Sequence, residues 1–169
     1  MKGFCEKCRD MVEYYVKTVD KEKEIKGRKL KYVGKVAYCN ECKEEIFVPE
    51  IRDYNLRALD DAYREAENLI KVDDIEQILE KYDIGKRPLS LLLGWGEGTL
   101  TRYVGGDTPT KPYSDLLKRI LVDEDYYRQI LKDNKDKISD VAYSKSINAV
   151  EIMSIKSGTV INKLESAVK

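Results

Sequence analysis

Two Cys-x-x-Cys pairs, CEKC at residues 5–8 and CNEC at residues 39–42, contain all four cysteines of the chain and are separated by 30 residues. Two such pairs can surround one tetrahedral zinc ion, because each short turn directs two sulfurs toward a common point. The expected ligands of one Zn²⁺ per chain are Cys5, Cys8, Cys39 and Cys42. Four thiolates close the coordination shell, so the metal is expected to be structural.

Two other uses of the cysteines stay open at this point. A rubredoxin-like iron site has the same four ligands, although its turns usually carry Pro and Gly, whereas Arg9 and Lys43 follow these pairs. Redox thiols or disulfides are the other alternative, but a redox Cys-x-x-Cys normally opens a helix in a βαβ context, and neither pair has that setting.

The remaining composition favours a binding protein over an enzyme. The chain has no histidine, so the usual general base near neutral pH is missing. No signal segment and no run of roughly 18 apolar residues is present, so we expect a cytoplasmic protein without a membrane partner. Structural disulfides seldom persist in that compartment.

Charge is distributed unevenly, although 31 basic and 31 acidic residues cancel overall. Residues 60–83 contain nine acids and three bases, whereas residues 86–121 contain six bases and three acids. The acidic stretch either engages a basic partner or faces water. The basic stretch is where we expect a nucleic-acid contact.

The first 50 residues predict a small zinc ribbon with a short antiparallel sheet. Residues 12–19 and 28–38 are rich in Val and Tyr, which favours strands, and the charged segment 21–27 between them is expected to be a turn. A core this small generally needs additional stabilisation, and the bound metal would supply it. Pro49 is expected to end the domain.

A mostly helical region follows, so the expected fold class is α+β. Residues 51–71 are expected to be a linker helix, 72–122 a helix-turn-helix domain, and 123–169 a helical extension. The extension would serve dimerisation or partner contact, or begin a further domain. One long helix across residues 52–82 is the alternative for the linker. Further helices are expected at 73–82, 89–93, 97–104, 113–121, 125–133 and 138–155.

The helix-turn-helix prediction rests on LSLLLGWGEGTLTRYVGG at residues 89–106. Such a unit needs a small residue where its helices cross and a glycine in the turn, and Ser90 and Gly94 meet these needs. The apolar residues expected to pack the pair together are Leu89, Leu93, Trp95, Leu100 and Tyr103.

The opposite face of the second helix would then read the major groove of double-stranded DNA. The groove-facing residues on this prediction are Glu97, Gly98, Thr101 and Arg102, and the phosphate contacts are Lys86, Arg87, Thr99 and Lys111. Arg102 is the expected base contact, since arginine can bond guanine with two hydrogen bonds. The alternative is a plain helical bundle with a charged, solvated face.

Over residues 1–122 the chain resembles the MqsA-type antitoxins, which join a YgiT-type zinc finger to a Cro/repressor-like helix-turn-helix. The shared features are the two cysteine pairs at this separation, GRK at residues 27–29, and TRY at residues 101–103 ahead of a glycine. The resemblance implies zinc at the four cysteines, a homodimer on a palindromic operator, and a cognate toxin as partner. A base-reading asparagine of the family falls on Gly98, so only the Arg102 contact carries over.

The sequence therefore predicts a zinc-stabilised, sequence-specific DNA-binding regulator. By the resemblance it is an antitoxin that represses its own operon. The alternatives are a zinc-ribbon adaptor for protein interactions and a phage-type repressor without a toxin. A non-enzymatic role is common to all three.

Overall fold

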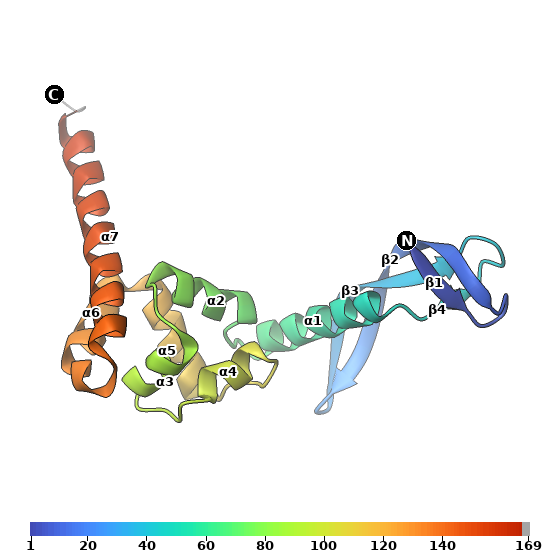
Figure 1. Cartoon of the computed structure of the whole chain (residues 1–169), viewed down its shortest axis with the longest axis horizontal. Helices are drawn as coiled ribbons and strands as arrows, with labels where there is room; N and C mark the ends of the chain where they lie inside the picture. The colour runs from blue at the N-terminus through green and yellow to red at the C-terminus, as the bar shows by residue number, and fades with distance from the viewer. Residues whose placement is uncertain (167–169) are drawn as a thin grey trace. The chain divides into compact units, whose positions relative to one another are not determined.

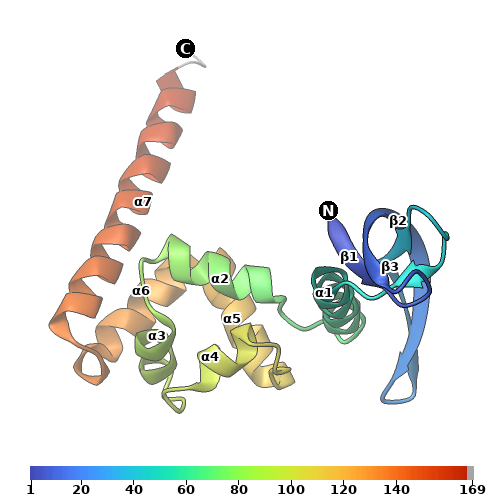
Figure 2. The same cartoon turned by 45° about the vertical axis from the view of Figure 1, so that its right-hand side comes forward.

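The computed structural model describes the backbone of residues 1–166 and side chains through residue 155, and it confirms the α+β class. A four-stranded antiparallel sheet with strand order β1-β2-β3-β4 precedes seven α-helices within these residues (Figures 1 and 2). The strands are β1 (Lys2–Cys5), β2 (Asp10–Ile25), β3 (Arg28–Cys39) and β4 (Glu45–Ile46). The helices are α1 (Pro49–Ala66), α2 (Val72–Lys81), α3 (Lys86–Leu92), α4 (Thr99–Val104), α5 (Lys111–Val122), α6 (Glu124–Asp133) and α7 (Asp140–Ser166), with a 3-10 turn η1 (Lys135–Lys137).

The chain forms two compact units, Met1–Asn68 and the part from Leu69 onward. The first unit contains the sheet and α1, and the second contains the other helices. Each unit has its own buried apolar cluster.

The hairpin of β2 and β3 is longer than its sequence pattern indicates. The prediction of a charged turn over residues 21–27 is wrong, because β2 continues to Ile25 and the reversal takes only two residues. Lys26 (φ 50°) and Gly27 (φ 77°) both have positive φ, as a type I′ turn requires. The charges suit a strand pair, since acids of β2 lie opposite lysines of β3 and such cross-strand pairs are stabilising.

Helix α1 belongs to the first unit and is not a free linker. It begins at Pro49, whose fixed φ and missing N–H suit the first helical turn. It ends at Ala66, five residues earlier than expected, and Asn68 has φ 51°, which excludes one long helix.

An amide on α1 fastens the helix to the sheet. The Lys35 N–H donates to Asn55 Oδ1 at 2.7 Å, and Asn55 Nδ2 donates to the Lys35 carbonyl at 2.8 Å. Asn55 thus satisfies the edge of β3 as a further strand would.

The second unit is held by apolar side chains that recur three or four residues apart on each helix, as expected for amphipathic helices. Its fully buried members include Ile75, Ile78, Leu89, Leu92, Leu100, Leu117, Ile120, Tyr127, Leu131 and Val150. No helix within residues 1–166 combines the length and the apolar character needed to cross a membrane.

The region expected to be an extension packs into this same core. The Asp123 carboxylate caps α6 by accepting a hydrogen bond from the Tyr126 N–H at 2.8 Å. The Tyr127 ring stacks on Tyr82 with 3.8 Å between centroids, and its hydroxyl lies 2.6 Å from Ser146 Oγ on α7. Burial of two tyrosines therefore ties α6 and α7 to α2.

We predict that the second unit loses stability at alkaline pH. Burial raises the pKa of Tyr127 to about 12, and it also raises the pKa of Tyr82. An unfolded tyrosine ionises near pH 10, so between about pH 10 and about pH 12 the unfolded state releases protons first, and stability falls as pH rises. The free energy of unfolding, from urea titrations followed by helical circular dichroism, should decline by roughly 1–3 kcal/mol per tyrosine across that window.

Tyr127→Phe is the matching variant, because it removes one ionising hydroxyl and keeps the ring stacking. Its alkaline decline should be shallower than that of the parent chain. An identical decline in both proteins would mean that Tyr127 does not couple folding to pH.

Candidate metal centre and nucleic-acid interface

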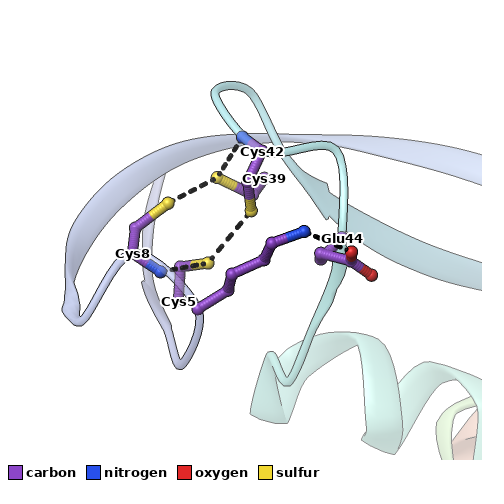
Figure 3. Close-up of polar contacts among 6 residues, drawn as sticks. Cys5, Cys8, Cys39, Cys42 and Glu44 are labelled. Atoms are coloured by element: carbon purple, nitrogen blue, oxygen red, sulfur yellow. Dashed lines mark hydrogen bonds and ion pairs between the residues drawn. The ribbon is translucent and has the colours of Figure 1, made fainter.

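The structure brings the four cysteines together as predicted, within a part of the sheet where β1 and β3 end (Figure 3). Their sulfurs all lie within 4.8 Å of one another, with 3.5 Å between Cys5 and Cys42 and 3.9 Å between Cys8 and Cys39. A zinc–sulfur bond of about 2.3 Å in tetrahedral geometry implies sulfur separations of about 3.8 Å. The four side chains can therefore hold one metal ion.

Both cysteine turns have the same backbone geometry. Arg9 N–H donates to the Cys5 carbonyl at 2.7 Å, and Lys43 N–H donates to the Cys39 carbonyl at 3.1 Å. Arg9 (φ 54°) and Lys43 (φ 64°) are both left-handed, a conformation that glycine adopts most easily. Basic side chains thus occupy the positions where glycine is usual in such turns.

The turns also supply hydrogen bonds to sulfur. The Cys8 N–H lies 3.5 Å from Cys5 Sγ, and the Cys42 and Glu41 N–H groups lie 3.5 Å and 3.3 Å from Cys39 Sγ. The donations from Cys42 and Glu41 lower the pKa of Cys39 to about 7. One sulfur is therefore prepared to be a thiolate near neutral pH.

The sulfur of Cys8 resists ionisation when no cation is near. Hydrogen bonding with the thiols of Cys42 and Cys5, together with burial, raises the pKa of Cys8 to about 12. The pKa of Cys39 is lowered whereas that of Cys8 is raised, so the cluster accommodates one thiolate. Further thiolates require a cation to balance their charge.

A disulfide arrangement does not match this geometry. The shortest sulfur separation is 3.5 Å, far from the bond length of about 2.05 Å. An ion pair also joins the two turns, since Lys7 Nζ lies 2.7 Å from Glu44 Oε1. An ion bound by all four sulfurs would have no coordination position left for a reacting molecule.

Ser90 joins helices α3 and α4, at the position where the sequence predicted a small residue. Its buried hydroxyl donates to the Lys86 carbonyl at 2.9 Å and accepts from the Leu100 N–H at 3.2 Å. One side chain therefore fixes the first turn of α4 against α3.

The connection between these helices uses the predicted glycine. Gly94 has φ 73°, and the Trp95 N–H then donates to the Ser90 carbonyl at 2.9 Å. Trp95 lies in the core and stacks on Tyr113 with 4.2 Å between centroids. The tryptophan is a packing residue, and it is not an exposed stacking platform.

Helix α4 is shorter than the predicted helix over residues 97–104. It begins at Thr99, so Glu97 lies in the connection and Gly98 is the residue before the helix. Thr101 and Arg102 are exposed on α4, and no ion pair of Arg102 is found within the described residues. Arg102 is the single basic residue of α4, and it is exposed to solvent.

Several of the other predicted DNA contacts are engaged elsewhere. Arg87 forms a two-hydrogen-bond ion pair with Glu97, at 2.9 Å and 3.1 Å, and the Lys111 ammonium pairs with Asp115. The Thr99 side chain is 6% exposed, which removes it from the surface that could contact phosphate. Lys86 is half-buried at the start of α3.

Some features had little signal in the sequence. The pairing of Arg87 with Glu97 depends on how the connection folds, since the two residues are ten apart. The left-handed Arg9 and Lys43 were detectable only as two basic residues in equivalent places. Asn55 had no signal, because an exposed-looking helix position does not reveal a contact with a strand.

The comparisons with known proteins gave no relative on which to place these residues. No protein-family model matches the chain, and no curated protein matches it.

We predict that the purified chain holds one zinc ion and that removing the ion unfolds the first unit. Two of the six buried residues in the apolar cluster of the first unit are cysteines. Once the metal is removed, these thiols would become protonated and move apart, which would open the core. A chelator titration followed by metal analysis and by strand circular dichroism should show loss of metal and sheet together. The helical signal of the second unit should remain.

Cys39→Ser should abolish stoichiometric metal binding. Glu6→Gln is the matched control, because Glu6 lies exposed in the first cysteine turn and offers no sulfur. A metal-free chain that keeps its sheet would contradict a structural role for the ion.

Proposed function

We propose that this protein is a zinc-stabilised transcriptional regulator that binds double-stranded DNA through α3 and α4. The observation that carries the proposal is the Ser90 hydroxyl that clamps α4 to α3, combined with the exposed Arg102 on α4. A helix-turn-helix unit needs both a rigid helix crossing and an exposed second helix.

Charge supports the same proposal. The segment from α3 to α5 has six bases against three acids, and Arg102 is exposed on α4. In the proposed complex, Arg102 bonds a base edge and Lys86 approaches a backbone phosphate. Thr101 lies beside Arg102 and completes the groove-facing surface.

Zinc is the proposed ion because the donor set is four thiolates in a closed shell. Zinc accepts this geometry without redox chemistry, which suits a structural site. Iron has the same ligands available in principle, but the usual glycines of an iron–sulfur knuckle are absent at Arg9 and Lys43.

The antitoxin role is the more specific part of the proposal and rests on the resemblance to MqsA-type proteins. It implies a two-fold dimer on a palindromic operator, with half-sites about 34 Å apart. A cognate toxin would then be a second partner. The same DNA-binding surface would serve a repressor that has no toxin.

We predict that Arg102→Ala weakens binding to the preferred duplex by about 5- to 150-fold, since one base contact is worth roughly 1–3 kcal/mol. The duplex would first be selected from random sequences with the parent chain, and affinity would be measured by gel shift at several salt concentrations. Affinity of the parent should fall steeply as salt rises.

Lys132→Ala is the control, because it removes one exposed positive charge from α6 and leaves α3 and α4 unchanged. Equal losses in both variants would indicate nonspecific attraction. No loss in Arg102→Ala would remove this arginine from the interface.

We also predict that Glu97→Gln strengthens DNA binding several-fold. The change removes a negative charge from the connection before α4 and frees the Arg87 guanidinium, which Glu97 now holds. Attraction to phosphate should increase on both counts. In the Glu97→Gln/Arg87→Gln double variant the gain should be smaller, because only the part due to the removed carboxylate remains, whereas an undiminished gain would show that Arg87 does not reach the DNA.

A further inference from the structure

The β2–β3 hairpin has one face whose positive charges the sheet does not balance. Side chains of a strand alternate between faces. Lys17, Lys21 and Lys23 therefore share one face of β2, and Asp20, Glu22 and Glu24 share the other.

The acidic face is compensated within the hairpin. The register sets Glu22 opposite Lys31 and Glu24 opposite Lys29. On the lysine face the register instead sets Val36 opposite Lys17, Tyr32 opposite Lys21, and Leu30 opposite Lys23. Within the described residues no ion pair is found for Lys17, Lys21 or Lys23, so this face keeps its charge.

A hollow of about 530 Å³ lies on this lysine face, between the hairpin and α1. Figures 1 and 2 show α1 alongside the hairpin. Lys21 and Lys23 line one side, Leu56 of α1 lines the other, and Tyr32 and Val36 lie between them. A Cβ at Gly34 would come within 2.7 Å of Lys21 Cδ and 3.0 Å of Asn55 Oδ1, so this glycine leaves room for the lysine stem.

The hollow also collects large apolar side chains that face solvent. Phe47 is 66% exposed, and Phe4 and Leu56 are each 53% exposed, although all three line the same concavity. Exposed apolar residues gathered in a groove are typical of an interaction site. Isolated exposed apolar residues need no such explanation.

From these observations we propose that the groove binds an acidic, amphipathic segment of a partner protein. Its apolar side chains would contact Phe47 and Leu56, and its carboxylates would pair with Lys21 and Lys23. Four bases and two acids line the groove, Lys21, Lys23, Lys35 and Arg52 against Glu6 and Glu45. The aliphatic Leu56 offers no ring on which a base could stack, which favours a peptide over a nucleic acid. This site is separate from the proposed DNA-binding surface and does not depend on it.

The test uses the full zinc-loaded chain and a synthetic helical peptide of about 18 residues as probe. The peptide carries Leu and Phe at positions i, i+3, i+4 and i+7 and Glu elsewhere, the pattern of a helix that docks in a groove. A scrambled peptide of the same composition and a peptide with Lys in place of Glu are the comparison probes. Binding is measured by fluorescence anisotropy at two salt concentrations.

Two pairs of variants separate the groove from the rest of the hairpin. Lys21→Gln/Lys23→Gln removes two charges from the groove, and Lys29→Gln/Lys31→Gln removes the same two charges from the opposite face. Leu56→Ser removes an apolar contact, and Val33→Ser is its control because Val33 is also 53% exposed but lies on the other face.

We expect the acidic helical peptide to bind, and the groove double variant to weaken it by about three- to tenfold, with little change in the opposite-face variant. Leu56→Ser should also weaken it, and Arg102→Ala should not. Equal binding of the scrambled or basic peptide would overturn the proposal. Equal effects in both lysine pairs, or no binding of the acidic helical peptide, would overturn it as well.

Discussion

Four sulfurs gathered within 4.8 Å cannot all carry charge unless a cation lies among them, and the first unit depends on that constraint. The first cysteine turn follows β1 and the second follows β3, and 30 residues separate the two cysteine pairs in sequence. Hydrogen bonds in those turns lower the pKa of Cys39, while hydrogen bonding with the thiols of Cys42 and Cys5, together with burial, raises the pKa of Cys8. A metal ion bound by the four cysteines would resolve the conflict and would also stabilise a core that is small for the sheet it supports.

The second unit is instead held by apolar packing, because its six helices share one apolar core. Its polar groups perform local tasks within that core. The Ser90 hydroxyl sets the crossing of α3 and α4, and the Tyr127 hydroxyl meets Ser146 on α7. The helix pair proposed to bind DNA is therefore supported by α6 and α7 as well as by its nearest neighbours. Substitutions that destabilise the first unit can therefore leave the proposed DNA-binding helices of the second unit intact.

The sequence predicts those features that follow from local spacing. Each cysteine turn, the crossing serine and the glycine turn at Gly94 depend on a few neighbouring residues, and each was predictable. The long hairpin was not, because its charged strand resembles a turn until the opposing lysines of β3 are paired with it. The end of the linker helix, the Asn55 contact and the Arg87–Glu97 pair depend on distant residues. Burial of Thr99 likewise follows from where α4 begins.

We propose a division of tasks, in which a metal ion holds the first unit together and the second unit contacts DNA. DNA affinity of the full chain, measured before and after complete metal removal, tests it most directly. We expect loss of the sheet, with affinity for the selected duplex kept within about threefold, as for independent sites. Loss of DNA binding in step with loss of metal, restored when zinc is returned, would contradict it.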